Sequence, residues 1–351
     1  MKIGFYNPYL NSLSGGERYV LTLAGHWSKK HQVTVFWDNP SILKISENRF
    51  NLDLSNIKVV DNIFQQKSFI SKLFATSQYD LLFILSDGSI PTSCAANTIL
   101  HFQVPFQKIK FPFWKKLKAP SIVCNSFFTK QHIDPQIGQN AEVIYPPVDI
   151  DKFKPSKKEK IILSVGRFSS YFQAKKQEVL IDIFKKGVKK GILKGWKLVL
   201  TGGLLESDRD YFTKLHKSIE GFAIELLPNV IFPALQALYG TSTIYWHAAG
   251  YGETNPQYME HFGITTVESM AGGCIPVVFN AGGQPEIIQH KKNGYLWNTE
   301  EECLLYTEEI ILKRNNLKFI ETQAKETAKK YSSYQFCQAY DLLLDRLIKQ
   351  K

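Results

Sequence analysis

Short apolar runs that alternate with helical patterns are the feature that most restricts the fold of this chain. The runs are rich in β-branched and aromatic residues, a composition typical of buried strands. The intervals between them leave room for crossover helices, so the pattern predicts parallel α/β sheets. The runs are KIGFY, VTVFW, DLLFIL, NTIL and SIVCN in the first part of the chain, and KIILSV, WKLVLT, NVIF, STIYW and IPVVF in the second.

A proline- and lysine-rich stretch, residues 143–158, interrupts this pattern before it starts again. Such a composition is typical of linkers between domains. The chain has 351 residues, which is longer than most single domains. We therefore predict an α/β protein of two Rossmann-like domains, residues 1–152 and 153–330, that face each other across a ligand-binding cleft. A terminal helix in residues 331–351 is expected to cross back to the first domain.

Composition limits the class of protein and of partner. No apolar run reaches the roughly 18 residues that a membrane span needs, and the first residues enter a strand pattern with no sign of a signal peptide, which predicts a cytoplasmic location. The net charge of +11 favours an anionic partner, but no nucleic-acid-binding module is recognised. The cysteines are odd in number and lack a C-x-x-C pair, which argues against a disulfide framework.

Two glutamates, Glu260 and Glu268, lie eight positions apart around a glycine, Gly263. The residues ITTVESMA after this glycine predict a helix that stops at the next glycine pair, so Gly263 lies at a helix start, where free N–H groups favour a phosphate. Carboxylates would repel the phosphate itself, and their natural partners on either side are sugar hydroxyls. The pattern indicates a nucleotide sugar. An isolated pair with this spacing would more often be two solvated charges.

The whole segment from residue 245 to residue 288, YWHAAGYGETNPQYMEHFGITTVESMAGGCIPVVFNAGGQPEII, resembles the carboxyl-terminal signature of glycosyltransferase family 4. These are retaining enzymes of the GT-B fold. Five further motifs occur earlier in the chain in the same order as in that family: SGGERYV, YPPVD, SVGRF, KKQEVLIDIF and NVIF. The resemblance therefore covers essentially the full chain. The residues of this signature are similar to those of bacterial group 1 glycosyltransferases and of the GDP-mannose-dependent mannosyltransferases that extend lipid-linked oligosaccharides.

The resemblance implies a role for each residue of this signature. Glu268 would hold the ribose hydroxyls of the nucleotide, and Glu260 the hydroxyls of the donor sugar. Arg167 and Lys175 would act as the basic pair on the leaving phosphates, where fixed cations stabilise the departing diphosphate. Lys176 is an alternative to Lys175, and both lysines could instead be solvated. The backbone N–H groups that would face the diphosphate are those of Gly263, Ile264 and Thr265.

Residues of the first domain complete the implied site. Gly15 and Gly16 would begin a helix that faces the cleft, although Ser14 and Glu17 also fit an ordinary helix cap. His101, after a predicted strand, matches a histidine that contacts the donor sugar in relatives, and the alternative is a buried packing residue.

The turn NAGGQPEII matches the turn that closes over the sugar and phosphates in the family. Gly283 and Glu286 are the residues that the resemblance assigns to donor binding. The same letters also fit a routine helix start, because proline is favoured at the first helical position.

Two groups of residues contain potential metal ligands, and neither has the pattern of a metal site. Asp208 and Asp210 have the D-x-D spacing of metal-dependent glycosyltransferases, but they precede a helical pattern and fit a helix start. His247, Glu260 and His261 do not have the spacing of a standard zinc site. We expect no metal and no cofactor beyond the nucleotide-sugar donor.

The resemblance implies retaining transfer of a hexose, with mannose as the candidate, to a glycan or lipid-linked acceptor. A sugar-nucleotide epimerase or phosphorylase of the same fold, or a non-catalytic sugar-nucleotide-binding subunit, remains an alternative. Lysines alternate with large apolar side chains in residues 105–118, PFQKIKFPFWKKLK. This mixture suits an anionic membrane surface and peripheral attachment, and equally suits rings packed in the core with solvated lysines.

Overall fold

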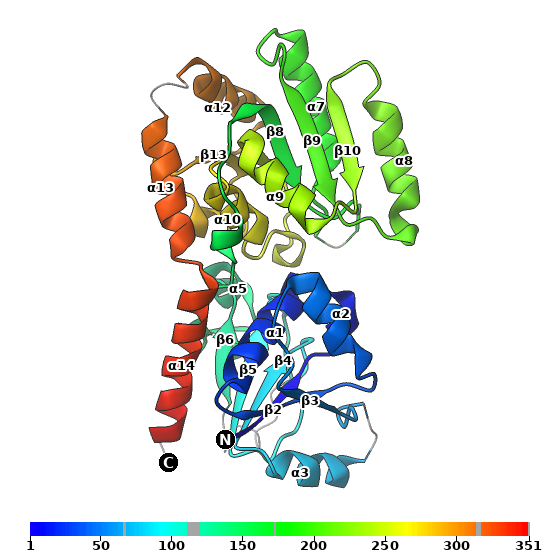
Figure 1. Ribbon diagram of the computed structural model, residues 1–351, viewed down its shortest axis with the longest axis vertical. Coiled ribbons are helices and arrows are strands. Elements are labelled where there is room, and N and C mark those ends of the chain that lie inside the picture. Colours follow the sequence, from blue (N-terminus) through cyan, green and yellow to red (C-terminus); the bar gives the residue numbers. More distant parts are fainter. Residues whose placement is uncertain (66–67, 111–119, 172, 314–316, 350–351) are drawn as a thin grey trace. The chain divides into compact units, whose positions relative to one another are not determined.

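The computed structural model describes residues 1–65, 68–110, 120–171, 173–313 and 317–349. The chain divides into two compact units (Figure 1). Unit 1 consists of Met1–Pro147 and Ser333–Lys351, and unit 2 of Val148–Ser332. The division falls inside the proline- and lysine-rich stretch, slightly before residue 152. Among the described residues, no helix is both long and apolar enough to span a bilayer.

Unit 1 is built on a parallel sheet. Within the described residues it has seven strands in the order β3-β2-β1-β4-β5-β6-β7. All five residues of β4 are buried, as expected for a parallel strand that is covered on both faces. The strands are β1 (Lys2–Tyr6), β2 (Gln32–Phe36), β3 (Ile57–Val60), β4 (Leu81–Leu85), β5 (Asn97–Phe102), β6 (Ser121–Cys124) and β7 (Glu142–Val143).

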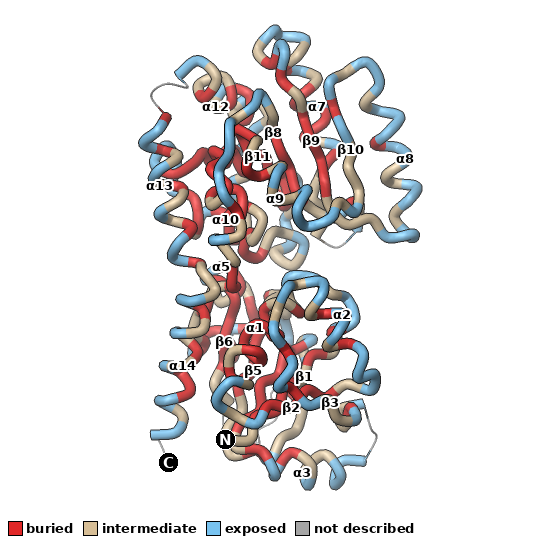
Figure 2. Tube along the Cα trace, in the orientation of Figure 1, coloured by how far each residue is buried: buried red, intermediate tan, exposed pale blue. Residues whose placement is uncertain are grey.

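The helices of unit 1 include the last helix of the chain. Tyr340 of that helix, α14, lies with its hydroxyl 2.8 Å from that of Tyr19 on α1, and Asp341 accepts a 2.9 Å hydrogen bond from the indole N–H of Trp27. Buried and exposed positions alternate along α14 (Figure 2). The helices are η1 (Leu10–Ser12), α1 (Gly15–Ser28), α2 (Ser41–Phe50), α3 (Phe69–Ser77), α5 (Phe127–His132), α6 (Pro135–Gly138) and α14 (Ser333–Lys349).

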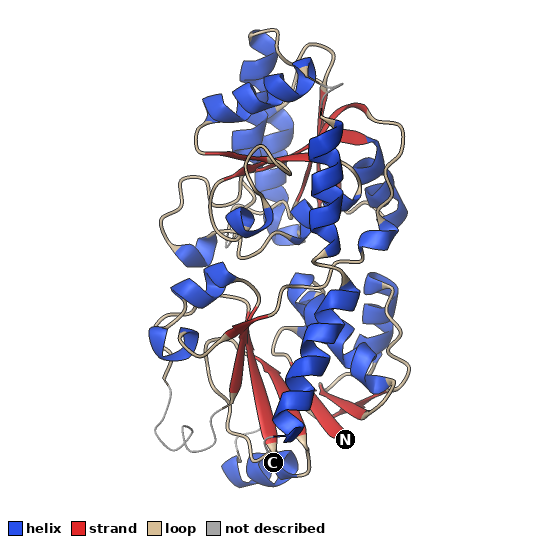
Figure 3. Ribbon diagram, turned by 90° about the vertical axis from the view of Figure 1, so that its left-hand side faces the viewer, coloured by secondary structure: helices blue, strands red, loops and turns tan. Residues whose placement is uncertain are grey.

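Unit 2 repeats the architecture. Its described residues form a six-stranded parallel sheet in the order β10-β9-β8-β11-β12-β13. The strands are β8 (Glu159–Val165), β9 (Lys197–Gly202), β10 (Ile224–Pro228), β11 (Ser242–His247), β12 (Ile275–Phe279) and β13 (Tyr295–Trp297). Helices lie along the strands in each unit (Figure 3). Those of unit 2 are η2 (Ile150–Lys152), α7 (Gln177–Lys189), η3 (Glu206–Asp208), α8 (Arg209–Ser218), α9 (Phe232–Thr241), η4 (Pro256–Tyr258), α10 (Ile264–Ala271), α11 (Gln284–Ile287), α12 (Glu300–Leu312) and α13 (Lys318–Lys329).

One predicted strand is wrong. The apolar run NVIF, residues 229–232, predicts a strand, but the strand in this region is β10, which ends at Pro228. Asn229 has a left-handed backbone with φ of 54°, and its side chain accepts a hydrogen bond from the Leu204 N–H at 3.0 Å, so the chain turns there. Helix α9 then begins at Phe232, with a proline in its first turn.

Candidate functional site

The start of α10 lies where the sequence predicts it. Gly263 is the N-cap, and its carbonyl accepts hydrogen bonds from the N–H groups of Thr266 and Val267. Ile264 and Thr265 come before Thr266 in the chain and lie in the first turn of the helix. The first N–H groups of a helix have no acceptor within the helix, so those of Ile264 and Thr265 can bind a ligand. Ile264 and Thr265 are also partly exposed. Together with the helix dipole, they form a site suited to a phosphate.

Gly263 is required by packing as well as by its backbone. Its φ is 122°, a conformation that side chains with a Cβ rarely adopt, and a Cβ here would lie 2.7 Å from Nε2 of Gln284. The missing side chain of Gly263 makes room for Gln284, a residue outside the set predicted from the sequence.

The turn before α11 packs against the loop that carries Glu260. The Gly283 N–H donates a 2.8 Å hydrogen bond to the Glu260 carbonyl oxygen, and a Cβ on Gly282 would lie 2.0 Å from the same oxygen. Both glycines therefore allow two backbone segments to lie in direct contact. Glu286 is partly exposed, and its carbonyl accepts a 3.1 Å hydrogen bond from the hydroxyl of Tyr331.

The carboxylate of Glu260 has two close partners on one oxygen. Oε2 is 2.8 Å from Nζ of Lys175 and 3.1 Å from Nε2 of His247. Burial by itself would raise the pKa of Glu260, but the charge of Lys175 and the hydrogen bond from His247 hold that pKa well below its usual range. Glu260 is therefore a carboxylate at neutral pH, and it can accept hydrogen bonds but cannot donate them.

The two neighbouring lysines point to different partners. The aliphatic part of the Lys175 side chain packs against Gly166, where an added Cβ would lie 2.5 Å from Cγ of Lys175. Lys175 therefore lies directly beside the backbone that precedes Arg167. Lys176 instead forms a 2.7 Å ion pair with Glu253. Arg167 follows β8 and is exposed. The structure thus brings Lys175, rather than Lys176, together with Glu260 and with the backbone next to Arg167.

Glu268 is held by a buried tyrosine. Its Oε2 accepts a 2.9 Å hydrogen bond from the hydroxyl of Tyr239, and Glu268 is only 6% exposed. Burial, followed by the charge of Glu268, raises the pKa of Tyr239 well above its usual value, so the phenol stays protonated and donates. The alternative that Glu268 is a solvated charge does not describe this side chain.

In unit 1, Gly15 and Gly16 begin α1 as expected. The carboxylate of Glu17 accepts a 2.9 Å hydrogen bond from the Ser14 N–H, so the ordinary helix cap is present. A Cβ on Gly16 would lie 2.5 Å from Oε1 of Gln103. The side chain of Gln103 therefore lies against the first turn of α1.

His101 is a packing residue in the structure. Its side chain has no exposed surface, its ring stacks on Tyr19 with centroids 4.0 Å apart, and burial lowers its pKa to about 3. A contact with a donor sugar would need exposed atoms. The buried alternative given above describes what is observed, and we leave His101 out of the proposed donor site.

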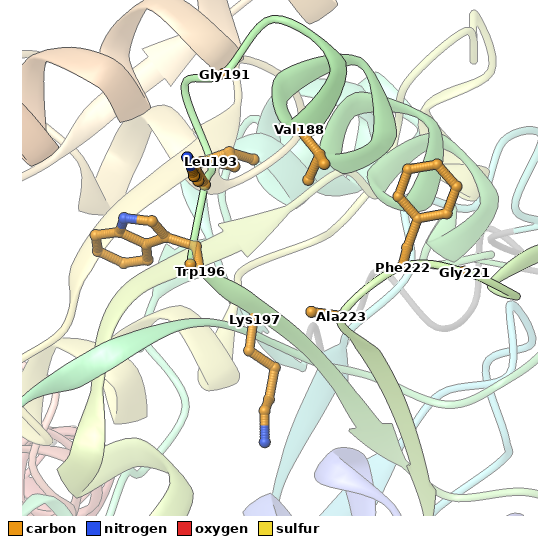
Figure 4. A pocket seen from close by; sticks show the side chains of 10 residues that line it. Val188, Gly191, Leu193, Trp196, Lys197, Gly221, Phe222 and Ala223 are labelled. Carbon is orange, nitrogen blue, oxygen red and sulfur yellow. The ribbon is translucent and has the colours of Figure 1, made fainter.

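The remaining candidates lie elsewhere. Asp208 ends η3 and Asp210 lies in the first turn of α8, where acidic residues favour a helix start. No group of three or more metal-ligating side chains was found in the described part of the chain. A hollow of about 410 Å³ is lined by residues that include Leu193, Trp196 and Phe222 (Figure 4). It lies at the amino end of β9, the opposite end of that strand from the candidate site.

Comparisons with known proteins give similarity over most of the chain. The profile of the family described as "Glycosyl transferases group 1" matches residues 147–327, and that of "Glycosyltransferase Family 4" matches residues 13–152. Two similar proteins are both named GDP-Man:Man(3)GlcNAc(2)-PP-Dol alpha-1,2-mannosyltransferase. The one from Dictyostelium discoideum is 27% identical over 65% of this chain and 48% of its own length. The human one is 24% identical over 86% of this chain and 78% of its own length.

The chain therefore spans about half the length of the Dictyostelium relative. Solved structures share the fold over the whole chain. A glycosyltransferase from Rickettsia africae has a TM-score of 0.79 at 20% identity, covering 100% of this chain and 99% of its own. HepE from Anabaena, solved with UDP and glucose, has a TM-score of 0.73 at 18% identity and covers 99% of this chain and 100% of its own. Because one profile alone covers more than half of the 351 residues, the chain belongs to the group 1 glycosyl transferases, with the GT-B fold.

Proposed function

We propose that the protein is a retaining glycosyltransferase that moves a hexose from a nucleoside-diphosphate sugar to a hydroxyl of a glycan or lipid-linked acceptor. Mannose is the candidate sugar, because the similar curated proteins are named as GDP-mannose-using mannosyltransferases with a PP-Dol acceptor. The observation that carries the proposal is the placement of two carboxylates: Glu268 is buried on α10, and Glu260 is partly buried on the loop before it and paired with Lys175.

Each side chain then has a distinct task. The diphosphate would lie at the start of α10, with Arg167 and Lys175 as its cations. Glu268 would accept hydrogen bonds from the ribose, and Glu260 from hydroxyls of the sugar. Both glutamates suit hydroxyl groups because an ionised carboxylate only accepts.

The chemical step follows from where charge develops. As the glycosidic bond breaks, the leaving nucleoside diphosphate gains negative charge, and Arg167 and Lys175 stabilise it as fixed cations. In the structure Lys175 is paired with Glu260, so a diphosphate would share this ammonium group or draw it away. Retention follows if the leaving phosphate oxygen accepts the proton of the acceptor hydroxyl on the face from which it departs. This route needs neither a metal nor a side-chain base.

A product assay tests the proposal. The protein is incubated with GDP-mannose and, in parallel, UDP-glucose, with and without a lipid-diphosphate oligosaccharide acceptor. Acceptor-dependent release of the nucleoside diphosphate, with an α-linked product, is the expected result. Conversion of the donor without acceptor would favour an epimerase, and formation of a sugar 1-phosphate from added phosphate would favour a phosphorylase. Binding without any turnover would point to a non-catalytic subunit.

We also propose a cytoplasmic location with peripheral attachment to an anionic membrane surface. Of the basic and aromatic segment 105–118, residues 111–118 lie outside the described residues. Helix α3 supports the proposal, because Phe69, Ile70 and Phe74 are all more than half exposed. Sedimentation with anionic and neutral vesicles at low salt tests it. Binding to the anionic vesicles should fall when Phe69 and Phe74 are replaced by serine, and equal recovery in the supernatant with both vesicle types would contradict attachment.

A further inference from the structure

The carboxylate of Glu260 is connected to the first turn of α10 by a chain of buried polar side chains. Behind it lies His247, at the end of β11, with a side chain only 2% exposed. Nδ1 of this ring is 3.5 Å from Nε2 of Gln284, and the hydroxyl of Thr266 donates a 3.0 Å hydrogen bond to Oε1 of Gln284. Four side chains from separate segments of unit 2 therefore form one connected series.

The direction of each hydrogen bond follows from this order. The amide oxygen of Gln284 accepts from Thr266, so its amide N–H group faces His247. Nδ1 of the ring is then the acceptor, and in a neutral imidazole the proton is on the other nitrogen, Nε2. Nε2 thus donates to Glu260. A second hydrogen bond that fixes the tautomer and the orientation of a histidine is a familiar way of holding a functional ring in place.

This arrangement uses one oxygen of Glu260 and leaves the other available. Lys175 and His247 both contact Oε2, and among the described residues no partner is found for Oε1. Lys175 is also the proposed phosphate cation, and it would be drawn toward a bound diphosphate. His247 is fully enclosed and has no such second task. Its N–H therefore remains on Oε2 when Lys175 turns to the ligand.

We propose that His247 is a positioning residue for the donor sugar: through Gln284 and Thr266 it holds Oε2 of Glu260, so that Oε1 faces a sugar hydroxyl. The inference rests on the proposed function and adds a specific role to it. The sugar hydroxyl is recognised by the Glu260 carboxylate, and the orientation of this carboxylate does not depend on Lys175. Loss of His247 would disturb recognition of the sugar and leave recognition of the nucleotide intact, because Glu268 and the backbone N–H groups of Ile264 and Thr265 are not members of this series.

The test compares His247→Phe, which removes the N–H, with His247→Gln, which restores a donor at similar reach. His216→Phe is the matched control, because this histidine is exposed on α8 of the same unit. Binding of GDP and of GDP-mannose is measured by calorimetry, with UDP and UDP-glucose in parallel, and transfer by steady-state kinetics.

We expect His247→Phe to bind the nucleoside diphosphate as the wild type does. Its affinity for the nucleotide sugar and its kcat/KM should fall by about tenfold to a hundredfold, the usual loss for a hydrogen bond to a charged group. His247→Gln should recover most of this loss, and His216→Phe should show none. Equal weakening of both ligands, or no change in either, would overturn the positioning role.

A second variant covers the case in which His247→Phe does not fold. Gln284→Leu breaks the same series one step away, and it should also weaken GDP-mannose selectively, by a smaller factor. Unchanged binding of both ligands in this variant would contradict the inference. A wild-type protein that binds and uses none of the four ligands would instead overturn the proposed function, and this inference with it.

Discussion

At the scale of single residues, the two glutamates of the signature, Glu260 and Glu268, have different surroundings. Glu260 is kept ionised mainly by the neighbouring charge of Lys175, whereas Glu268 takes a hydrogen bond from the neutral hydroxyl of Tyr239. Glu260 lies beside Lys175, one of the two proposed cations of the leaving group, and Glu268 lies in the second turn of α10. Their replacement should therefore affect different steps.

Glu268→Gln should mainly raise the dissociation constant for GDP, because it weakens contacts to the ribose. Glu260→Gln should mainly lower kcat and leave GDP binding unchanged. Calorimetry with GDP and steady-state kinetics with GDP-mannose separate the two effects. Wild-type kinetics in both variants would show that the site has been assigned wrongly.

Arg167→Ala should lower kcat by two or more orders of magnitude, roughly the loss seen when one preorganised contact to a developing charge is removed. Added chelator should leave wild-type activity unchanged, because Arg167 and Lys175 supply the positive charge in the proposed mechanism. Transfer rates with and without chelator provide the measurement. Activity that returns only with magnesium or manganese after chelation would favour Asp208 and Asp210 instead.

His261 should make the stability of unit 2 depend on pH. Burial lowers its pKa from 6.5 to about 4. Between these values the unfolded chain binds a proton that the folded protein does not bind, so the free energy of unfolding falls as the pH falls. The loss at pH 4.5 is on the order of 2 kcal/mol. His261→Gln should reduce the slope of Tm against pH in this window, and His216→Gln, at an exposed site, should not. Equal slopes in all three proteins would contradict the prediction.

At the scale of elements, the start of α10 depends on a glycine for two separable reasons. Gly263 has a positive φ, and its missing Cβ leaves room for Gln284. Gly221 also has a positive φ, of 78°, but nothing lies within 4 Å of where its Cβ would be. The pair therefore allows backbone strain to be distinguished from crowding.

Gly221→Ala should cost only the backbone strain, about 1–2 kcal/mol. Gly263→Ala should cost a further 1–3 kcal/mol, roughly, because Gln284 has to move. It should also weaken GDP-mannose binding, since Gln284 supports His247. Chemical denaturation and calorimetry give both quantities. Similar losses of stability in the two variants would show that Gln284 adapts without cost.

At the scale of the whole molecule, the last helix completes the core of unit 1. Tyr340 of α14 is fully buried, and its ring lies against those of Tyr19, Trp27 and Phe83. Tyr334, on the same helix, is 66% exposed. The chain therefore returns its final segment to the unit in which it began.

Tyr340→Ala should destabilise unit 1 by about 3–5 kcal/mol, because it leaves a cavity among aromatic rings. Tyr334→Ala should change stability by less than about 0.5 kcal/mol. Hydrogen exchange of α1 and α14 amides locates the effect in unit 1. Unaltered protection of α1 in Tyr340→Ala would show that α14 does not stabilise it.

The sequence by itself determined the features that depend on neighbouring residues. Apolar runs predicted most strands, because period and β-branched content are local properties, and Gly263 marked the start of α10 for the same reason. NVIF failed because the left-handed turn at Asn229 is supported by Leu204, a distant residue that a local pattern does not contain.

Only the tertiary structure decided which side chains meet. The sheet order places β11 between β8 and β12, and the ends of these parallel strands bring His247 to Glu260 and Gln284 to His247. Burial of His101 and the pairing of Glu260 with Lys175, rather than with Lys176, were decided in the same way. The physical reason is that contact, burial and pKa depend on strand order and on the packing of segments far apart in the chain, whereas residue spacing carries only local geometry.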